Sequence, residues 1–313
     1  MRIVKKAEIE EALKSADIFT AIKNAFIQFS KGEVNTPPVG YLPFPDANGD
    51  LHIKYGHIKK DDVFVIKLST GFYNNPKKDL PSSNGLMMVL SAITGEPIAL
   101  LEDGGILTDI RTAVAGAITS NALRPTAAPR VGVIGTGTQA RLQLQYLSKL
   151  IPDASYSVWG RDKYKTAAYV SDMAKVGLYV ELMPTARSLC EQVNIIISTT
   201  PSTSPIIQTE WIKPGTHITA VGADAPGKQE FEASIFARAS FTLFDSKEQC
   251  LHHGEASHSN ISFNETNSAE LGVLLEKPGI FKRQQAHVTV ADLTGIAAQD
   301  IAIAKAVWHQ IKS

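Results

Sequence analysis

The sequence predicts an α/β protein in which a doubly wound, largely parallel sheet is inserted in a second, discontinuous α+β domain. Its length of 313 residues exceeds that of a typical single core, so two domains are expected. After Pro125, short apolar runs alternate with helical segments, which is typical of a parallel sheet with helices on both faces. Between residues 38 and 103, apolar runs are separated by turn dipeptides instead, which predicts successive strands.

The individual elements follow from the spacing of the apolar residues. A helical pattern covers residues 18–29 and stops at Gly32, and the charged segment 1–14 before it also looks helical. Further helices are expected over 108–122 and 297–312. The strands expected in the parallel sheet are 130–135, 155–160, 178–182, 193–200, 217–224, 240–246 and 287–293.

The order of these elements predicts a discontinuous domain. The last helix follows the last strand of the parallel sheet, and its apolar stripe requires a partner surface. It is long enough to pack back onto the first part of the chain. We therefore expect residues 1–124 and 294–313 to form one domain and residues 125–293 to form the inserted domain.

Composition excludes several classes of protein. Lys plus Arg and Asp plus Glu each number 31, so the net charge is zero and the basic excess of a nucleic-acid-binding protein is missing. No apolar run approaches the ~18 residues that span a bilayer, and the charged N-terminus has no leader pattern. Cys190 and Cys250 provide no disulfide framework. We expect a cytoplasmic protein that binds neither nucleic acid nor membrane.

No metal site is expected. Cys250, His252, His253 and His258 lie close together in the sequence. Adjacent histidines on one helical turn point in different directions, however, and no second cluster of ligands follows, so this spacing does not favour zinc.

The strongest motif is GTGTQA at residues 135–140, which joins an apolar strand to a helix. It has the GxGxxA form of the dinucleotide-binding fingerprint. In that fingerprint Gly135 permits a tight turn, Gly137 lets the backbone approach a pyrophosphate, and Ala140 allows close packing of helix and strand. Free N–H groups at the start of the helix favour phosphate binding. The motif predicts a Rossmann-type dinucleotide-binding domain.

The next strand indicates which dinucleotide is bound. NAD-binding domains usually end this strand with an acid that binds the ribose 2′-hydroxyl, but here it ends in Gly160, followed by Arg161. An arginine can pair with a 2′-phosphate through charge-assisted hydrogen bonds, although a surface arginine at a strand end is also common. The pattern favours NADP(H), with NADPH preferred over NADH.

At this point the sequence resembles the ornithine cyclodeaminase/mu-crystallin family. The resemblance rests on VIKLSTGFYNNP around Lys67, on the long run GLMMVLSAITGEPIALLEDGGILTDIRTAVAGAIT, on the GxGxxA loop and on AVGADAPGKQEF around Asp224. It covers nearly the whole chain. It implies a homodimer whose first domain, residues 1–124 and 294–313, carries substrate-binding groups and the subunit contact.

The resemblance assigns three main site residues. Lys67 matches the family's substrate lysine and is expected to act in binding and catalysis; a lysine in an apolar strand needs an anionic partner, unless it lies at the sheet edge. Arg111 matches the arginine of the family's RTA motif, expected to contact both substrate and cofactor. Asp224 matches the acid/base aspartate of the cyclodeaminases, and would otherwise be an Asp that opens a Pro-Gly turn.

The resemblance also implies further contacts. Thr294 is expected at the substrate. Residues expected at the cofactor are Ser82, Ser83, Thr138, Gln139, Thr200, Val221 and Gly295, together with Gly135, Gly137 and Arg161 from the motif itself.

One departure from the family concerns the substrate carboxylate. Many members carry an arginine in a Gln-Pro-Val-Arg segment, where this chain has Gly40. The stretch HIKYG at 52–56 replaces the family's Met-Pro-Ala-Tyr and is similar to the pyrroline-2-carboxylate reductase branch. Lys54 is therefore a candidate for the missing cation, or else an exposed strand residue.

These features predict an NADPH-dependent reductase of a small cyclic imino acid, 1-pyrroline-2-carboxylate or its six-membered homologue 1-piperideine-2-carboxylate, giving L-proline or L-pipecolate. Two alternatives stay open. An ornithine cyclodeaminase would recycle one bound NAD, which the Arg161 and Gly40 positions disfavour. A mu-crystallin-like protein would bind NADP and a small ligand without turnover, and mu-crystallins lack an acid at the position of Asp224.

Overall fold

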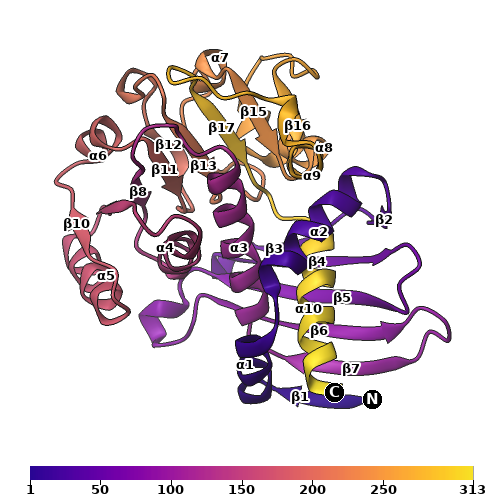
Figure 1. Cartoon of the computed structure of the whole chain (residues 1–313). Coiled ribbons are helices and arrows are strands. Elements are labelled where there is room, and N and C mark those ends of the chain that lie inside the picture. The colour runs from indigo at the N-terminus through magenta and orange to yellow at the C-terminus, as the bar shows by residue number, and fades with distance from the viewer. Residues whose placement is uncertain (313) are drawn as a thin grey trace. The chain divides into compact units, whose positions relative to one another are not determined.

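The computed structural model describes residues 1–312; Ser313, the last residue of the predicted range 294–313, lies outside them. The chain divides into two compact units (Figure 1). The first comprises Met1–Arg111 and the segment from Ile296 onward, and the second comprises Thr112–Gly295. The first division falls inside a helix, between Arg111 and Thr112, whereas the sequence prediction placed the domain boundary after Arg124.

The first unit is built on one sheet. Its strands are β1 (Arg2–Lys5), β2 (Val34–Asn35), β3 (Gly40–Phe44), β4 (Gly49–Ile58), β5 (Val63–Phe72), β6 (Ser83–Ser91) and β7 (Pro97–Glu102). They lie in the order β1-β7-β6-β5-β4-β2, with β3 also paired to β4. The β2-β4, β3-β4, β4-β5, β5-β6 and β6-β7 pairs are antiparallel, and β1 is parallel to β7.

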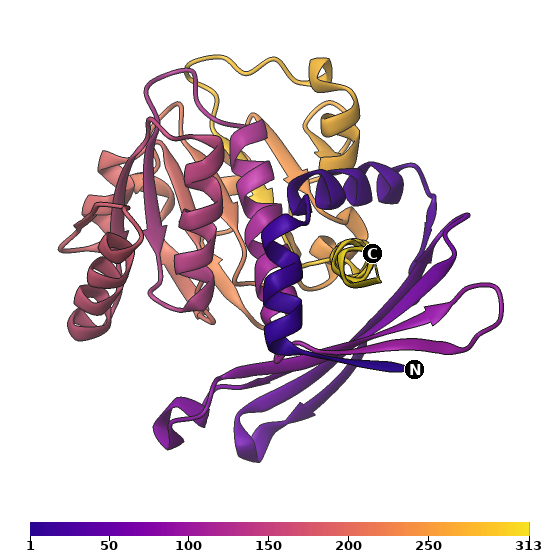
Figure 2. The same cartoon turned by 60° about the horizontal axis from the view of Figure 1, so that its bottom comes forward.

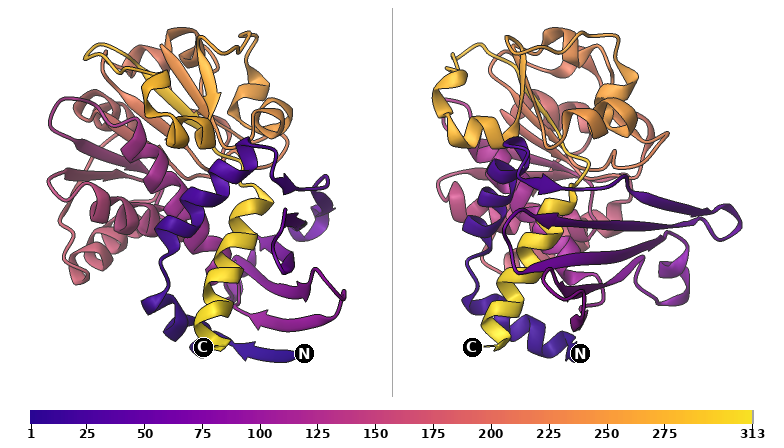
Figure 3. Two further views of the ribbon diagram at one scale, coloured as in Figure 1. Left: turned by 45° about the vertical axis from the view of Figure 1, so that its right-hand side comes forward. Right: turned by 90° about the vertical axis from the view of Figure 1, so that its right-hand side faces the viewer.

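The helices of this unit are α1 (Lys6–Ser15), α2 (Ile18–Ser30), the first turns of α3 (Ile106–Ala122) and α10 (Ala297–Lys312), with short turns η1 (Pro45–Ala47) and η2 (Asn75–Lys78). Helix α10 packs against α2 and against β4, β5 and β6, and it lies across these strands in both views of Figure 3. In Figure 2 the helices of the unit lie on one side of the sheet.

Two boundaries in this unit differ from the sequence prediction. Residues 2–5 form a strand, not a helix, because they pair with β7 at the edge of the sheet and the side chain of Val4 is fully buried. Helix α3 begins at Ile106 rather than near Thr108, because the Asp103 carboxylate accepts a hydrogen bond from the N–H of Leu107 at 2.9 Å.

The second unit contains an eight-stranded parallel sheet. Its strands are β8 (Arg130–Ile134), β9 (Ser155–Trp159), β10 (Val180–Leu182), β11 (Ile195–Ser198), β13 (His217–Ala220), β15 (Phe241–Phe244), β16 (Ser268–Glu270) and β17 (Thr289–Asp292), and a separate parallel pair is formed by β12 (Thr203–Ile207) and β14 (Gln229–Phe231).

Helices and turns connect these strands. They are the rest of α3, α4 (Thr138–Leu150), α5 (Lys163–Lys175), α6 (Ala186–Gln192), α7 (Ile235–Arg238), α8 (Lys247–His253), α9 (Leu271–Glu276), η3 (Thr209–Trp211), η4 (Glu255–His258) and η5 (Pro278–Ile280). The central strands are buried along their whole length: β11 reads Ile-Ile-Ile-Ser, and β13, β15 and β17 are also fully buried, as expected for strands covered on both faces.

The strand order indicates at which edge of the sheet a ligand would bind. The order is β10-β9-β8-β11-β13-β17-β15-β16, so the first five strands of the unit follow the 3-2-1-4-5 arrangement of dinucleotide-binding sheets. The order reverses between β8 and β11. In such sheets ligands bind beyond the carboxyl ends of the strands at this reversal. The predicted α/β class and the Rossmann-type sheet are confirmed.

Candidate functional site

The carboxyl edge of the parallel sheet gathers most of the predicted residues of the second unit. The residues that follow its strands are Gly135, Gly137, Thr138 and Gln139 after β8, Arg161 after β9, Thr200 after β11, Val221 and Asp224 after β13, and Thr294 and Gly295 after β17. Parallel strands end at the same edge of a sheet, so topology alone brings these positions to one side of the unit.

The loop at 135–140 has the geometry of a phosphate-binding turn. Gly135 has φ +119°, and a Cβ there would lie 2.6 Å from the hydroxyl of Thr199. A Cβ on Gly137, by contrast, would meet open space. Gly137 is the N-cap of α4 and supplies no side-chain cap, so the first N–H groups of this helix are left for a ligand. The residues present therefore fit a bound pyrophosphate.

Arg141 stabilises this loop and was not predicted from the sequence. Its guanidinium donates to the carbonyl oxygens of Thr136 and Gly137, and to the carboxylate of Asp172 at 2.8 Å. Because Arg141 lies on α4, these bonds connect the backbone of the loop to the helix that follows it. The signal available in the sequence was a cation one turn into the helix, which is too common to be specific.

The turn after β9 favours a cation over an acid. A Cβ on Gly160 would lie 2.5 Å from Thr136 and 2.7 Å from Thr166, so an acidic side chain at this position would require the turn to move. Asp162 is nearby, but its carboxylate caps α5 by accepting from the N–H groups of Tyr164 and Lys165. Arg161 is exposed, and no ion pair to it is found within residues 1–312. This arrangement suits a 2′-phosphate.

Asp224 lies in the loop beyond β13. Its carboxylate accepts a hydrogen bond from the Lys228 ammonium group at 2.7 Å, and about half of its side chain is exposed. The loop between them contains Gly227 with φ +82°. The Pro-Gly turn therefore brings the two ends of the loop together as an ion pair, and Asp224 is held as a carboxylate that solvent can reach.

The loop after β17 is held by Asp245, another residue that the sequence did not indicate. Its carboxylate accepts from the N–H of Gly295 at 2.5 Å and from the hydroxyl of Thr294 at 3.1 Å. Asp245 follows β15 directly and is 1% exposed. A buried carboxylate therefore sets the position of two residues predicted at the substrate and the cofactor.

The first unit brings three predicted cations together. Lys54 on β4 is directly opposite Lys67 on β5, and the same row continues through Met87 and Leu101 to Val4. All five side chains are buried; Lys54 is 7% and Lys67 is 2% exposed. Because directly opposite residues share a face of the sheet, both lysines point to its buried face. Lys54 is thus not an exposed strand residue, and Lys67 is not at the sheet edge.

Asp300 on α10 compensates these cations and was missed in the sequence. Its carboxylate forms ion pairs with Lys67 at 2.9 Å and with Arg111 at 2.8 Å, and Gln299 accepts a hydrogen bond from Arg111 at 2.7 Å. Lys54, Lys67 and Arg111 are thus three buried cationic side chains, and Asp300 forms ion pairs with two of them. A buried group of cations favours the binding of an anion.

The pKa values of the cluster follow from burial and from the neighbouring charges. Burial is the largest cause that lowers the pKa of Lys67, Arg111 and Lys54 add to the lowering, Asp300 acts in the opposite direction, and the resulting pKa is about 7. Burial alone would raise the pKa of Asp300, but Arg111, Lys67 and Lys54 outweigh burial and hold that pKa below its ordinary value. Lys67 therefore exchanges its proton near neutral pH, whereas Asp300 stays ionised.

Ser82 and Ser83 are not part of this cluster. Ser83 is the first residue of β6 and pairs with Gly71, whereas Lys67 pairs with Met87 farther along the strand. The carbonyl of Ser82 accepts a hydrogen bond from the N–H of Phe72. The two serines mark the end of the β5–β6 pair, and their predicted contact with the cofactor stays a prediction.

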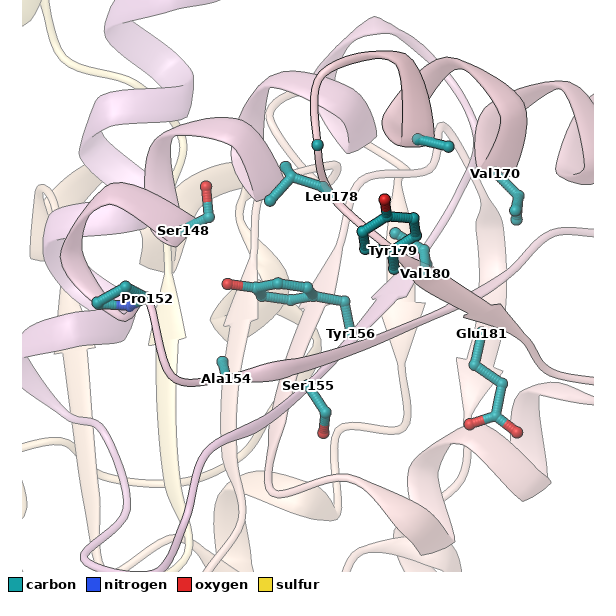
Figure 4. Close-up of a pocket in the computed structure, with 12 residues that line it drawn as sticks. Ser148, Pro152, Ala154, Ser155, Tyr156, Val170, Leu178, Tyr179, Val180 and Glu181 are labelled. Atoms are coloured by element: carbon teal, nitrogen blue, oxygen red, sulfur yellow. The ribbon is translucent and has the colours of Figure 1, made fainter.

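A groove elsewhere in the second unit contains none of the predicted residues. Figure 4 shows the ring of Tyr156 across its middle, with Pro152, Ala154 and Ser155 on one side and Leu178 and Tyr179 on the other. Several of these residues precede or begin β9 and β10, so the groove belongs to the amino ends of these strands. Ligands of doubly wound sheets bind at the carboxyl ends.

The described residues also bear on metal binding and on membranes. Within residues 1–312, no group of three or more His, Cys, Asp or Glu side chains is arranged to hold a metal ion. Over the same residues, no helix combines the length and apolar character required to cross a membrane.

Comparison with known proteins identifies the family. The sequence profile of the Ornithine cyclodeaminase/mu-crystallin family matches residues 1–313. The chain belongs to this family. The resemblance predicted from the Lys67, Arg111 and Asp224 motifs is therefore confirmed.

Family members similar to this chain include several oxidoreductases by name. It is 37% identical to a Rhizobium meliloti protein provisionally named a dehydrogenase (97% of this chain, 94% of the relative) and 31% identical to the iminosuccinate reductase of Paracoccus denitrificans (100% and 97%). It is 26% identical to the Delta(1)-pyrroline-2-carboxylate reductase of Bacillus cereus (99% and 96%).

A solved family structure has the same fold. An archaeal alanine dehydrogenase, described as a dimer with bound NAD, superposes with a TM-score of 0.89 at 30% sequence identity, over 99% of this chain and 95% of the other. This similarity supports a nicotinamide dinucleotide as the ligand class for the fingerprint loop.

We predict that anion binding by this family member weakens as pH rises through about 7. A carboxylate binds the charged form of Lys67, which is complete below that pH and lost above it. The dissociation constant of pyrrole-2-carboxylate, measured by calorimetry, should rise severalfold between pH 6 and pH 8.5. The Lys67→Met variant should bind weakly and without this pH dependence.

The matched control is Lys77→Met, which removes an exposed lysine in η2 and should keep the wild-type pH profile. A dissociation constant that stays flat over this range in the wild type would contradict the role of Lys67.

We also predict that Arg161→Ser changes cofactor preference. Loss of a charge-assisted hydrogen bond to a 2′-phosphate costs about 1.5–3 kcal/mol, so the dissociation constant of NADPH should rise roughly ten- to a hundredfold while that of NADH stays unchanged. Fluorescence titration measures both, with Arg187→Ser, an exposed arginine on α6, as control. Equal weakening for the two cofactors would rule out recognition of the 2′-phosphate by Arg161.

Proposed function

We propose that this protein is an NADPH-dependent reductase of cyclic imino acids that converts 1-pyrroline-2-carboxylate to L-proline. The observation that carries the proposal is the burial of three cationic side chains, Lys54, Lys67 and Arg111, two of which pair with Asp300. Such a reaction also requires a hydride donor, and the dinucleotide-binding edge of the second unit would bind it.

The cation cluster suits the carboxylate of a small imino acid. Arg111 uses Nε and Nη1 for Asp300 and Gln299, and no acceptor for Nη2 is found within residues 1–312. Lys67 has one anionic partner, Asp300, for an ammonium group that carries three protons. A substrate carboxylate would accept hydrogen bonds from the donors of Arg111 and Lys67 that these pairs leave. Lys54 would supply the cation that Gly40 cannot.

The proposed cofactor contacts lie at the carboxyl edge of the parallel sheet. The start of α4, with Thr138 and Gln139, would hold the pyrophosphate, and Arg161 would hold the 2′-phosphate of the adenosine half. Thr200, Val221 and Gly295 would contact the nicotinamide half. When bound, the reduced nicotinamide supplies a hydride to the carbon of the C=N bond.

Asp224 is proposed to accept a hydrogen bond from the protonated imine nitrogen. A protonated iminium accepts hydride at carbon more readily than a neutral imine, and a carboxylate that hydrogen-bonds its N–H stabilises it. The ion pair with Lys228 fixes the position of the Asp224 carboxylate. The reaction balances as one imine, one hydride and one proton giving one amine, with the proton taken from solvent.

The relatives support the reaction class more strongly than the ring size. Among proteins similar to this chain, one is named for reduction of the acyclic iminosuccinate and one for reduction of pyrroline-2-carboxylate. Both names describe reduction of a C=N bond beside a carboxylate. The cyclic substrate is favoured by the HIKYG stretch that contains Lys54; a six-membered ring would be reduced by the same chemistry to L-pipecolate.

The test is the decrease in NADPH absorbance with 1-pyrroline-2-carboxylate. The wild type should turn over steadily, and Asp224→Asn should lower kcat about 10²–10⁴-fold, the usual range for loss of an acid–base group. The control Asp153→Asn changes an exposed acid in the turn before β9 and should keep full activity.

Other outcomes separate the alternatives. Ammonia release from ornithine without added NADPH would identify a cyclodeaminase, and tight NADPH binding without turnover of either imine would identify a binding protein. Wild-type turnover by the Asp224→Asn variant would leave the reductase in place and remove the proposed role of Asp224.

A homodimer is proposed through the second face of the first unit's sheet. On that face Tyr55, Ile66, Met88, Leu100 and Ile3 lie directly opposite one another across five strands. Tyr55 is 39% and Ile3 is 51% exposed, and the other three are partly buried. A continuous apolar row at a partly exposed sheet face is typical of a subunit contact, and the similar alanine dehydrogenase is described as a dimer.

We expect light scattering to give twice the chain mass for the wild type and the monomer mass for Ile66→Glu, because the substitution places a charge in the middle of this row. Ile93→Glu is the control, since Ile93 is 83% exposed in the turn after β6. A wild type that elutes as a monomer, or an Ile66→Glu variant that remains dimeric, would rule out this face.

A further inference from the structure

A buried carboxylate connects two loops of the dinucleotide-binding edge. Glu230, on β14, is fully buried, and its two carboxylate oxygens accept hydrogen bonds from different segments of the chain. Oε1 accepts from the N–H of Thr200 at 2.5 Å. Oε2 accepts from the N–H of Gly222 at 2.7 Å and from the hydroxyl of Ser198 at 3.0 Å. One side chain thus satisfies the loop after β11 and the loop after β13.

These two loops need such a partner because the sheet ends beneath them. Strands β11 and β13 are parallel neighbours that finish in register, with Ser198 opposite Ala220. The N–H groups of Thr200 and Gly222 lie beyond this last pair and are bonded to Glu230. A buried N–H group without an acceptor is costly, so the carboxylate fixes both loops at once.

Gly222 allows the carboxylate to approach this closely. A Cβ at Gly222 would lie 2.6 Å from the carboxylate carbon of Glu230 and would overlap the carbonyl oxygen of Thr200. Any side chain at this position would therefore separate the two loops. Gly222 and Glu230 therefore act together: the glycine leaves the space, and the glutamate holds the two loops at this short distance.

Other buried carboxylates support Glu230 in turn. Glu255, 1% exposed, accepts from the N–H of Glu230 at 2.6 Å, and Asp292 at the end of β17 accepts from the N–H of Ala256 at 2.9 Å. Burial raises the pKa of Glu230, that of Glu255 to about 9 and that of Asp292 to about 8. Keeping several acids in one apolar region costs free energy that a stable core alone does not require.

We propose that Glu230 is a positioning residue for the nicotinamide half of the cofactor. It holds the backbone of Thr200 and of the Val221–Gly222 segment in the place where that half binds, while the adenosine half depends on the loops after β8 and β9. The inference rests on the proposed function for its ligand. It is separate from catalysis, because Glu230 acts through backbone groups and not on substrate.

The substitution Glu230→Gln tests this role with little change in size. A glutamine offers one oxygen acceptor, and its NH₂ group faces an N–H donor, so one of the two loops loses its partner. The dissociation constant of NADPH should rise about tenfold or more, as expected for a lost hydrogen bond to a charged group. Binding of adenosine 2′,5′-bisphosphate, which has no nicotinamide half, should stay within about twofold of wild type.

Two further variants control this experiment. Glu232→Gln changes a partly exposed glutamate just beyond β14 whose carboxylate also accepts a backbone N–H, from Thr209, and it should bind NADPH like the wild type. Glu230→Asp keeps two acceptor oxygens on a shorter side chain and should recover part of the lost affinity. Fluorescence titration and thermal unfolding are measured for every variant.

The outcomes distinguish this inference from the proposed function. Unchanged NADPH affinity in Glu230→Gln overturns the inference alone, as does equal weakening of NADPH and of the adenosine fragment, which indicates general damage to the fold. A wild type that binds neither probe overturns both proposals. A wild type that binds NADPH but reduces no imine overturns the proposed function and leaves the role of Glu230 standing.

Discussion

The first unit depends on the two ion pairs that the Asp300 carboxylate forms with Lys67 and Arg111. The carboxylate stands between Lys67 and Arg111, two cations that would otherwise repel each other in a region with almost no solvent. An ion pair of this kind contributes little net stability, because desolvation offsets much of its Coulomb energy. Its effect is on position: it draws both cations toward α10 and sets how much positive charge remains for a ligand.

The sequence predicted the parts of the fold that repeat a known local pattern. The fingerprint at Gly135 and Gly137 indicated the parallel sheet because each glycine has a steric reason. Asp300 was missed because it lies among Ala, Ile and Gln in a helix whose pattern indicates only burial. Glu230 and Asp245 were missed because their partners are distant in sequence, or are backbone groups that carry no residue signature.

Buried charged side chains have different roles in the two units. In the first unit, Asp300 pairs with two buried cations, Lys67 and Arg111, which we propose as partners of an anionic ligand. In the second, carboxylates such as Glu230 and Asp245 are used by backbone N–H groups, so they hold loops in place and are not available to a ligand. This contrast explains why composition, with its zero net charge, gave no indication of either arrangement.

Helix α10 gives the chain a particular order of assembly. It is synthesised after every strand of the parallel sheet, yet it packs on β4, β5 and β6, which emerge from the ribosome much earlier. The second unit can therefore fold while the first still lacks its last helix and the Asp300 carboxylate that pairs with Lys67. In the folded unit α10 packs on the strands that carry Lys54 and Lys67, so the burial of these two lysines is completed by the last segment of the chain to be synthesised.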